Sequence, residues 1–340
     1  VGVNSAGTIH SASDVTVATD GSVTLGATDS TTKTSGAVTA GGNVTIKGYG
    51  AAGAASINNN NGKIIAGGAV NLNTSGALNN QSALMQSGGA MSLTGSAAGM
   101  NNTSGQLLAG STLSIATMGG AFNNTSGFVQ SQGGTSLTVD SLDNTAGTIQ
   151  DAGTGALNLI VANALNNGAN GQIQSKAGNL TINAGSIANS GQFGANSGAV
   201  SLRAGQGITN SGTVQSGQGL TINAASLNNT SGTLQDTGTQ NSTMTVGALT
   251  NTGGKLLVNR GDLAVTAGTI NNSGGTIGAK NASIDLTATS GAISNTNQGN
   301  IQATNGNVVM SANGVDNSNG LVGALAGSVY INANNGTFTN

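Results

Sequence analysis

The chain has 340 residues, including 58 Gly but no Pro and no Cys, and only 5% of its residues are charged. The absence of Cys excludes disulfides and thiolate metal sites, and no apolar run approaches the roughly 20 residues of a membrane-spanning helix. The net charge is −2, and the eight Lys and Arg residues are scattered singly, which excludes a basic surface of the kind that binds nucleic acid.

Residues 1–56 form the less regular part of the chain. Apolar residues still alternate around a central Thr, which is typical of half-buried strands. The clearest examples are Val15/Val17, Val23/Leu25 and Val44/Ile46. We interpret this range as divergent coils of the repeat that follows.

Residues 57–340 repeat one motif, an apolar residue, a variable residue and then Asn. The spacing between successive Asn residues is 19 to 23 positions and averages about 21 to 22, a period typical of a solenoid. The recurring Asn residues are Asn59, Asn80, Asn102, Asn124, Asn144, Asn167, Asn189, Asn210, Asn229, Asn251, Asn272, Asn295, Asn317 and Asn340.

Each repeat contains three short segments, as residues 165–188 illustrate. The first is the Asn motif, and the second and third are apolar-alternating segments separated by Gly, Asn and Ser. In the third segment we expect pairs such as Leu180/Ile182 to point inward. Such short strands fit one turn of a parallel β-helix, in which each strand pairs with its equivalent about 4.8 Å away in the next turn. Leu84, in a second segment, and the third-segment pairs Leu137/Val139 and Met244/Val246 are assigned inward by the same pattern.

The recurrent Asn has two structural explanations that the sequence leaves open. If the apolar residue points inward, the Asn two positions later lies on the same side, and stacked carboxamides form a hydrogen-bonded ladder. Alternatively, Asn occupies the corner because it tolerates left-handed backbone angles. Neither explanation requires a ligand.

Few residues carry recognisable chemistry. Arg260, Gly261 and Asp262 form the tripeptide that integrins recognise, although a Gly followed by Asn or Asp is also the ordinary corner of this repeat. The acids Asp140, Asp143 and Asp151 are close in sequence, but no acid recurs one coil away, as paired catalytic carboxylates would require. The only His is His10. We predict no enzymatic activity, no metal site and no cofactor.

The unit Ser226-Leu227-Asn228-Asn229-Thr230-Ser231-Gly232-Thr233-Leu234-Gln235, with a strand such as residues 219–224, resembles the haemagglutinin repeats of filamentous haemagglutinin-type exoproteins. That group includes two-partner-secretion adhesins and contact-dependent growth-inhibition toxin-delivery proteins. The resemblance covers about residues 57–340. It implies a right-handed parallel β-helix on a Gram-negative cell surface, exported through an outer-membrane β-barrel transporter.

We therefore predict an all-β solenoid of about 21 to 22 residues per coil, a fragment of a longer secreted filament that does not span the membrane. Its expected role is a structural shaft projecting a distal binding or toxic module, with host or neighbouring-cell receptors bound outside this segment. The alternative is direct receptor binding by this segment, through the Arg260 to Asp262 corner or an outward Thr/Gln face.

Overall fold

The computed structural model describes residues 3–4, 7–25, 35–49 and 53–340. This part of the chain forms β-strands joined by turns, and it contains no helix that could cross a membrane. It divides into two compact units, Val1–Gly178 (unit 1) and Asn179–Asn340 (unit 2). The expected boundary between divergent coils and regular repeats at residue 56 lies within unit 1 and stays a prediction. Residues 1–2, 5–6, 26–34 and 50–52 of that first range lie outside the described residues.

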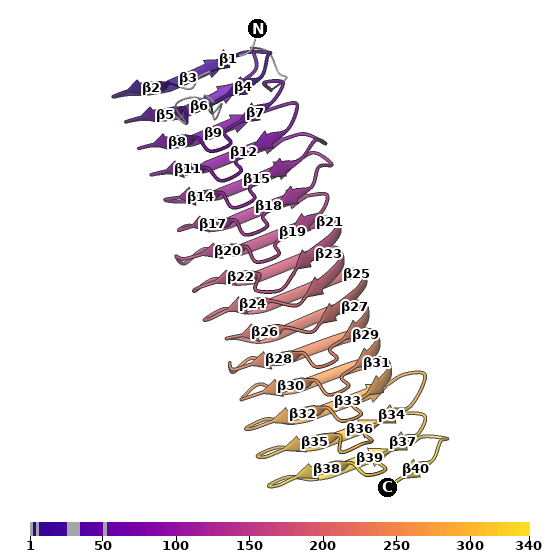
Figure 1. The fold of residues 1–340 in the computed structure, drawn as a ribbon. Coiled ribbons are helices and arrows are strands. Elements are labelled where there is room, and N and C mark those ends of the chain that lie inside the picture. Colours follow the sequence, from indigo (N-terminus) through magenta and orange to yellow (C-terminus); the bar gives the residue numbers. More distant parts are fainter. Residues whose placement is uncertain (1–2, 5–6, 26–34, 50–52) are drawn as a thin grey trace. The chain divides into compact units, whose positions relative to one another are not determined.

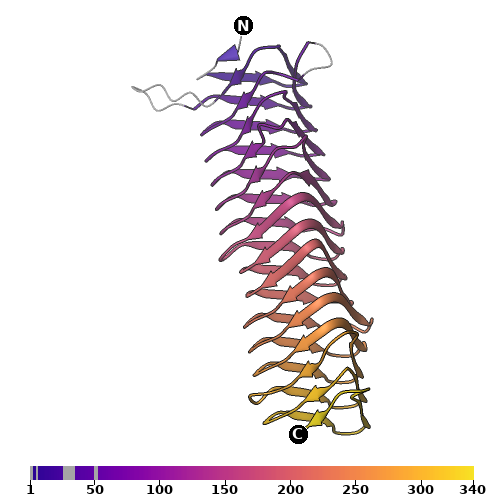
Figure 2. The same cartoon turned by 90° about the vertical axis from the view of Figure 1, so that its right-hand side faces the viewer.

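Within each unit, strands of successive turns lie side by side and parallel (Figures 1 and 2). Leu93, for example, is in register with Leu72 in the preceding turn and with Ile115 in the following turn. Each turn therefore closes the hydrogen-bonding edge of its neighbour, which is how a solenoid avoids exposed strand edges. The prediction of an all-β parallel β-helix is confirmed.

Unit 1 has three strands in a typical turn, matching the three segments of the repeat. The first strands are β1 (Val3–Asn4), β4 (Val23–Thr24), β7 (Ile57–Asn58), β10 (Leu78–Asn79), β13 (Met100–Asn101), β16 (Phe122–Asn123) and β19 (Leu142–Asp143). The second strands form a separate sheet of β2 (Thr8–Ser11), β5 (Ala37–Ala40), β8 (Lys63–Ala66), β11 (Leu84–Ser87), β14 (Gln106–Ala109), β17 (Phe128–Ser131), β20 (Thr148–Asp151) and β22 (Gln172–Ser175). The third strands are β3 (Val15–Ala18), β6 (Val44–Lys47), β9 (Val70–Asn73), β12 (Met91–Gly95), β15 (Leu113–Thr117), β18 (Thr135–Val139) and β21 (Leu157–Asn167), which also contains the next Asn motif.

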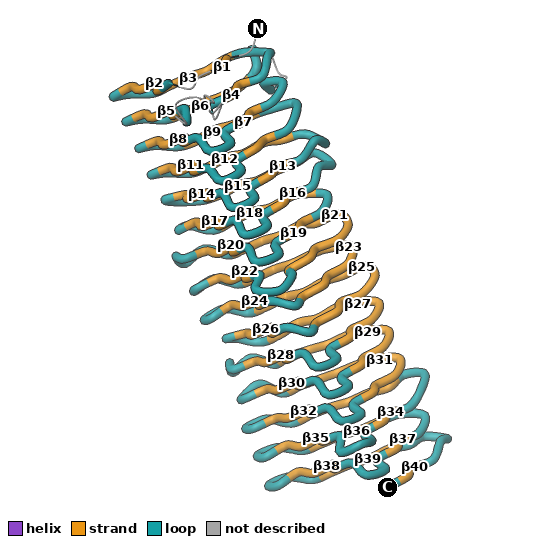
Figure 3. The backbone as a smooth tube through the Cα atoms, viewed as in Figure 1, coloured by secondary structure: helices purple, strands orange, loops and turns teal. Residues whose placement is uncertain are grey.

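In unit 2 several third strands continue without a break into the next first strand, and Figure 3 shows them as long uninterrupted strands. These long strands are β23 (Leu180–Asn189), β25 (Val200–Asn210), β27 (Leu220–Asn228), β29 (Ser242–Thr250) and β31 (Leu263–Asn271). Separate strands follow, namely β33 (Ile284–Ala288), β34 (Ile293–Ser294), β36 (Val308–Ser311), β37 (Val315–Asp316), β39 (Val329–Asn332) and β40 (Phe338–Thr339). The second strands are β24 (Gln192–Ala195), β26 (Thr213–Ser216), β28 (Thr233–Asp236), β30 (Lys255–Val258), β32 (Thr276–Ala279), β35 (Asn300–Ala303) and β38 (Leu321–Ala324).

The core of each unit consists of aliphatic side chains from alternate strand positions. Leu180 and Ile182 are buried as expected, and Phe122 and Phe193 are the largest fully buried side chains. Each such side chain contributes on the order of 1.5 to 3 kcal/mol, so the stability of each unit accumulates turn by turn. In the last turn Phe338 is exposed, because only one neighbouring turn packs against it.

One inward assignment from the sequence needs correction. In β11 the buried residue is Met85 and not Leu84, because Met85 is in register with Ile64 and Leu107. Two third-segment pairs are inward as expected, and the structure adds the register in which they stack. Leu137 and Val139 are buried, but Leu157 pairs with Thr135 and Leu159 pairs with Leu137.

The second pair has the same form. Met244 and Val246 are buried as expected, and Leu263 pairs with Ser242, two positions before Met244. In both turns a buried hydroxyl residue replaces the expected aliphatic. Each hydroxyl belongs to a hydrogen-bonded network around a buried Asp, described below, which is why the apolar pattern slips by two residues at these turns.

Candidate functional site

The recurrent Asn side chains form a continuous hydrogen-bonded ladder inside each unit. Each Nδ2 donates to the Oδ1 of the Asn in the following turn, at 2.7 to 2.8 Å, and the Asn residues from 59 to 317 are buried. In unit 1 the bonds run Asn59 to Asn80, Asn80 to Asn102, Asn102 to Asn124, Asn124 to Asn144 and Asn144 to Asn167. In unit 2 they run Asn189 to Asn210, Asn210 to Asn229, Asn229 to Asn251, Asn251 to Asn272, Asn272 to Asn295, Asn295 to Asn317 and Asn317 to Asn340.

Each ladder amide also ties its own turn to the next one. The Nδ2 of Asn124 lies 3.3 Å from the carbonyl oxygen of Gly127 and 3.2 Å from that of Thr148. A carboxamide has two N–H donors, so one meets the next Asn while the other is shared between these two carbonyls. The buried amide is thereby satisfied on both sides, which removes the desolvation cost of placing it in the core.

Gly follows most ladder Asn residues three positions later, and this requirement was not anticipated from the sequence. A Cβ on Gly105 would lie 2.0 Å from the carbonyl oxygen of Asn80 and 2.6 Å from the Oδ1 of Asn102. The residue before it, Ser104, has a left-handed φ of 53°. The signal was present as the recurring Asn-x-x-Gly spacing. The left-handed position of this turn therefore falls two residues after the ladder Asn, and the corner explanation applies to that residue instead.

The ladder in unit 1 starts at a defect. The Oδ1 of Asn59 is buried and accepts no hydrogen bond. In the preceding turn β4 is in register with β7, which puts the buried Leu25 at the position equivalent to Asn59. An aliphatic residue offers no donor, and an unpaired buried acceptor costs about 1 to 3 kcal/mol.

The Arg260 to Asp262 corner is part of a second row of contacts between turns. The Arg260 side chain is exposed, whereas Gly261 is buried, and a Cβ there would lie 1.8 Å from the carbonyl oxygen of Gln240. The Oδ1 of Asp262 accepts the backbone N–H of Ser283 at 2.8 Å. One carboxylate oxygen of this tripeptide is thus engaged in holding the next turn.

The same arrangement recurs at equivalent corners, where a side-chain oxygen accepts the backbone N–H of the equivalent residue one turn later. We call these contacts the corner acceptor row. Their distances are 2.6 to 3.2 Å, and the pairs are Asp14 with Asn43, Asn43 with Ala69, Asn179 with Ala199, Asn241 with Asp262, Asp262 with Ser283, Ser283 with Asn307 and Asn307 with Ser328.

The three neighbouring acids do not form a common site. Asp151 is buried, and its Oδ2 accepts hydrogen bonds from the Ser131 hydroxyl at 2.6 Å and from the Gly134 N–H at 2.7 Å. Asp143 instead lies at the variable position of its first strand, where its Oδ1 accepts the Thr145 hydroxyl. Asp140 accepts from the side chain of an Asn in the following turn. The three carboxylates therefore bond to separate partners.

A second buried acid, Asp236, shares part of the arrangement of Asp151, whose Oδ1 accepts no hydrogen bond. Its Oδ1 accepts the N–H groups of Gly219 and Gly238, each at 3.0 Å, and its Oδ2 accepts the Ser242 hydroxyl at 2.9 Å. Gly134 and Gly219 both have φ of 111°, and each precedes its Asp by 17 residues. We call these two networks the Asp clips.

The remaining chemistry-bearing residues are isolated. His10 is paired with Thr39 through Nδ1 at 2.7 Å, and in the described ranges no group of three or more metal-binding side chains comes together. The contacts described above stabilise the stacking of one turn on the next.

Comparison with protein-family models gives a match to the haemagglutinin repeat. The matched residues are 1–48, 45–124, 108–169, 239–302 and 277–319, which together exceed half of the chain. Comparison with curated proteins and with solved structures gives no significant match.

Proposed function

Because the chain belongs to the haemagglutinin-repeat family, we propose that it is a structural shaft segment of a large secreted surface protein, projecting a distal binding or toxic module. Proteins with these repeats are filamentous and adhesin-like, and the parallel solenoid of each unit fits that role. The observation that supports the proposal most is the use of polar side chains. The ladder, the corner acceptor row and the Asp clips all connect one turn to the next.

The finer parts of the proposal extend the family membership. We propose that the protein is exported by a two-partner mechanism through an outer-membrane β-barrel transporter and stays on a Gram-negative cell surface. The distal module would make it an adhesin or a contact-dependent inhibition toxin-delivery protein. Under this proposal the segment has no enzymatic activity of its own, and receptors contact regions outside it.

A deletion in register tests the shaft role. Asn229 and Asn251 are equivalent ladder positions, so removing residues 230–251 joins the chain one turn shorter while preserving the ladder. In the parent surface protein this deletion should leave attachment to target cells unchanged. Loss of attachment by a correctly displayed, folded deletion variant would contradict the shaft role.

The alternative is direct binding by the Arg260 to Asp262 corner, and one conservative change separates it from the shaft. Asp262→Asn removes the carboxylate charge but keeps an Oδ1 acceptor for the Ser283 N–H, as Asn241 and Asn307 do at equivalent corners. The shaft proposal expects no change in cell binding by the isolated chain. Saturable binding that Asp262→Asn abolishes, with stability unchanged, would favour the alternative.

A further inference from the structure

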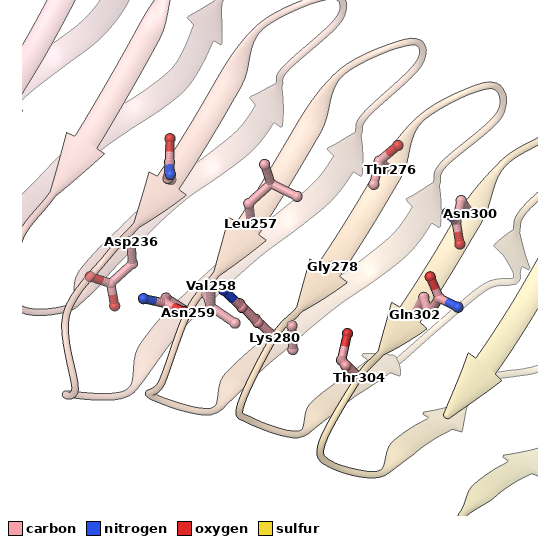
Figure 4. A pocket seen from close by; sticks show the side chains of 12 residues that line it. Asp236, Leu257, Val258, Asn259, Thr276, Gly278, Lys280, Asn300, Gln302 and Thr304 are labelled. Atoms are coloured by element: carbon pink, nitrogen blue, oxygen red, sulfur yellow. The ribbon is translucent and has the colours of Figure 1, made fainter. Parts of the chain in front are cut away.

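Gly278 occupies an outward strand position of unit 2, and the equivalent positions in the turns on either side carry long side chains. In the sheet of second strands, Gln235, Leu257, Gly278 and Gln302 occupy equivalent outward positions in successive turns. Gly278 has no side chain, and a depression of about 440 Å³ lies over β28, β30, β32 and β35. Figure 4 shows Gly278 in the middle, with Leu257 on one side and Asn300 and Gln302 on the other. A volume of this size is within the range of small-ligand pockets, about 300 to 1,000 Å³.

The lining of the depression combines hydrogen-bonding groups with a comparable area of apolar surface. Gln235, Thr276, Gln302 and Thr304 supply amides and hydroxyls, and Leu257 supplies one aliphatic side. The Oδ1 of Asn300 accepts no hydrogen bond, so turning this amide toward a ligand breaks no bond at that atom. Such a surface suits a ligand that presents both hydroxyl groups and apolar ring faces, as a sugar does.

Two exposed Lys side chains lie at or beside the depression. Lys280 lines it, and Lys255, at the start of β30, is in register with the lining residue Thr276. In the part of the chain that the structure describes, neither Lys side chain has a hydrogen bond or an ion pair. The one acid in the lining, Asp236, is already engaged in its clip.

We infer that this depression binds a short acidic oligosaccharide, with pyranose hydroxyls on the amides and Thr side chains, the apolar face of a sugar on Leu257, and a carboxylate near Lys280. Turns repeat about every 4.8 Å, so equivalent polar groups recur along the depression on the length scale of a sugar unit. Without an aromatic stacking platform we expect weak binding, with selection based on charge and hydroxyl geometry. This inference is independent of the shaft role, since a shaft can carry a weak glycan contact along its side.

The test uses the isolated chain and saturation-transfer NMR. The probes are a galacturonic acid trisaccharide, a hyaluronan tetrasaccharide and, as the neutral control, maltotriose. We expect at least one of the two acidic probes to bind, and which of them binds distinguishes a plant from an animal polysaccharide. Maltotriose should bind at least tenfold more weakly. Equal binding of maltotriose, or no binding of either acidic probe, would overturn the inference.

Three variants locate the site. Gly278→Gln fills the depression with the residue found at the equivalent positions 235 and 302, and it requires only the end of the Leu257 side chain to move, since its Cδ2 lies 3.1 Å from a Cβ at residue 278. Lys280→Gln removes the charge. Both should reduce binding at least tenfold. The matched control is Gly323→Gln, the same change at the same outward position one turn beyond Gln302, where a Cβ meets only the Gln302 Nε2 at 3.9 Å. Binding that survives Gly278→Gln, or that Gly323→Gln removes equally, would also overturn the inference.

Discussion

Adjacent residues Asn271 and Asn272 provide a direct comparison between a surface Asn and a ladder Asn. Asn272 is fully buried, accepts from the Nδ2 of Asn251 at 2.7 Å and donates to the Oδ1 of Asn295 at 2.7 Å. Asn271 is exposed, and its Oδ1 accepts only the N–H of Ser273 at 2.9 Å. Replacing each by Ala therefore changes the same residue type in two different environments.

The expected cost follows from the bonds that each change removes. Asn272→Ala loses two ladder bonds, each worth about 1 kcal/mol, and leaves the buried Oδ1 of Asn295 without a donor, at about 1 to 3 kcal/mol. We expect a loss of about 3 to 5 kcal/mol in the free energy of unfolding. Asn271→Ala removes one exposed hydrogen bond and should cost about 0.5 kcal/mol.

Hydrogen exchange measured by mass spectrometry is the appropriate assay, because repeat arrays open locally and a single global transition cannot be assumed. A loss of 3 kcal/mol raises the local opening equilibrium about a hundredfold. Backbone amides in β31 and β32 should therefore exchange about a hundredfold faster in Asn272→Ala and about twofold faster in Asn271→Ala. Equal protection in the two variants would refute the claim that the ladder stabilises the stack.

Changes at three further residues test contacts between turns and within a turn. Gly232→Ala should destabilise unit 2 by about 1 to 3 kcal/mol, measured by guanidinium unfolding, because its Cβ would lie 2.2 Å from the carbonyl oxygen of Asn210; an unchanged midpoint would contradict this. Asp236→Ala should cost about 2 to 4 kcal/mol by the same assay because it leaves two buried N–H groups without an acceptor, whereas Asp236→Asn should cost less. Hydrogen bonds from the Ser318 hydroxyl and then from its N–H hold the pKa of Asp316 below its usual value of 3.8. Their stabilisation is complete above that value and fades as the pH falls through the lower folded pKa, so Asp316→Asn should flatten this part of the stability profile measured in acid.

The ladder positions could be located from the sequence because their spacing tracks the turns of the solenoid. A residue that recurs every 19 to 23 positions beside an inward apolar residue lies on the inner side of every turn. Which atoms the amides contact could not be read from spacing. The carbonyl groups that share each Nδ2, and the Gly residues that make room for it, depend on the path of the turn between strands.

The buried hydroxyl residues Thr135 and Ser242 show where apolar patterning is incomplete. Pattern reasoning places aliphatic residues inside, yet these two inward positions carry hydroxyls because a buried Asp lies nearby. The partners of each Asp include an N–H from a Gly 17 residues earlier in the chain. Contacts between residues so far apart in the chain become visible only once the turns are stacked. The depression at Gly278 was not predicted either, because residues of four successive turns line it.

Disulfide trapping measures the stacking of turns most directly, since the chain has no Cys of its own. Thr245 and Thr266 are in register on adjacent turns, and Thr266 is in register with Thr287 on the next. The account predicts that Thr245→Cys with Thr266→Cys forms a disulfide rapidly on mild oxidation, because adjacent parallel strands lie about 4.8 Å apart. Thr245→Cys with Thr287→Cys, about 9.6 Å apart across two turns, should stay reduced. A rapid bridge in the second pair, or none in the first, would contradict the account.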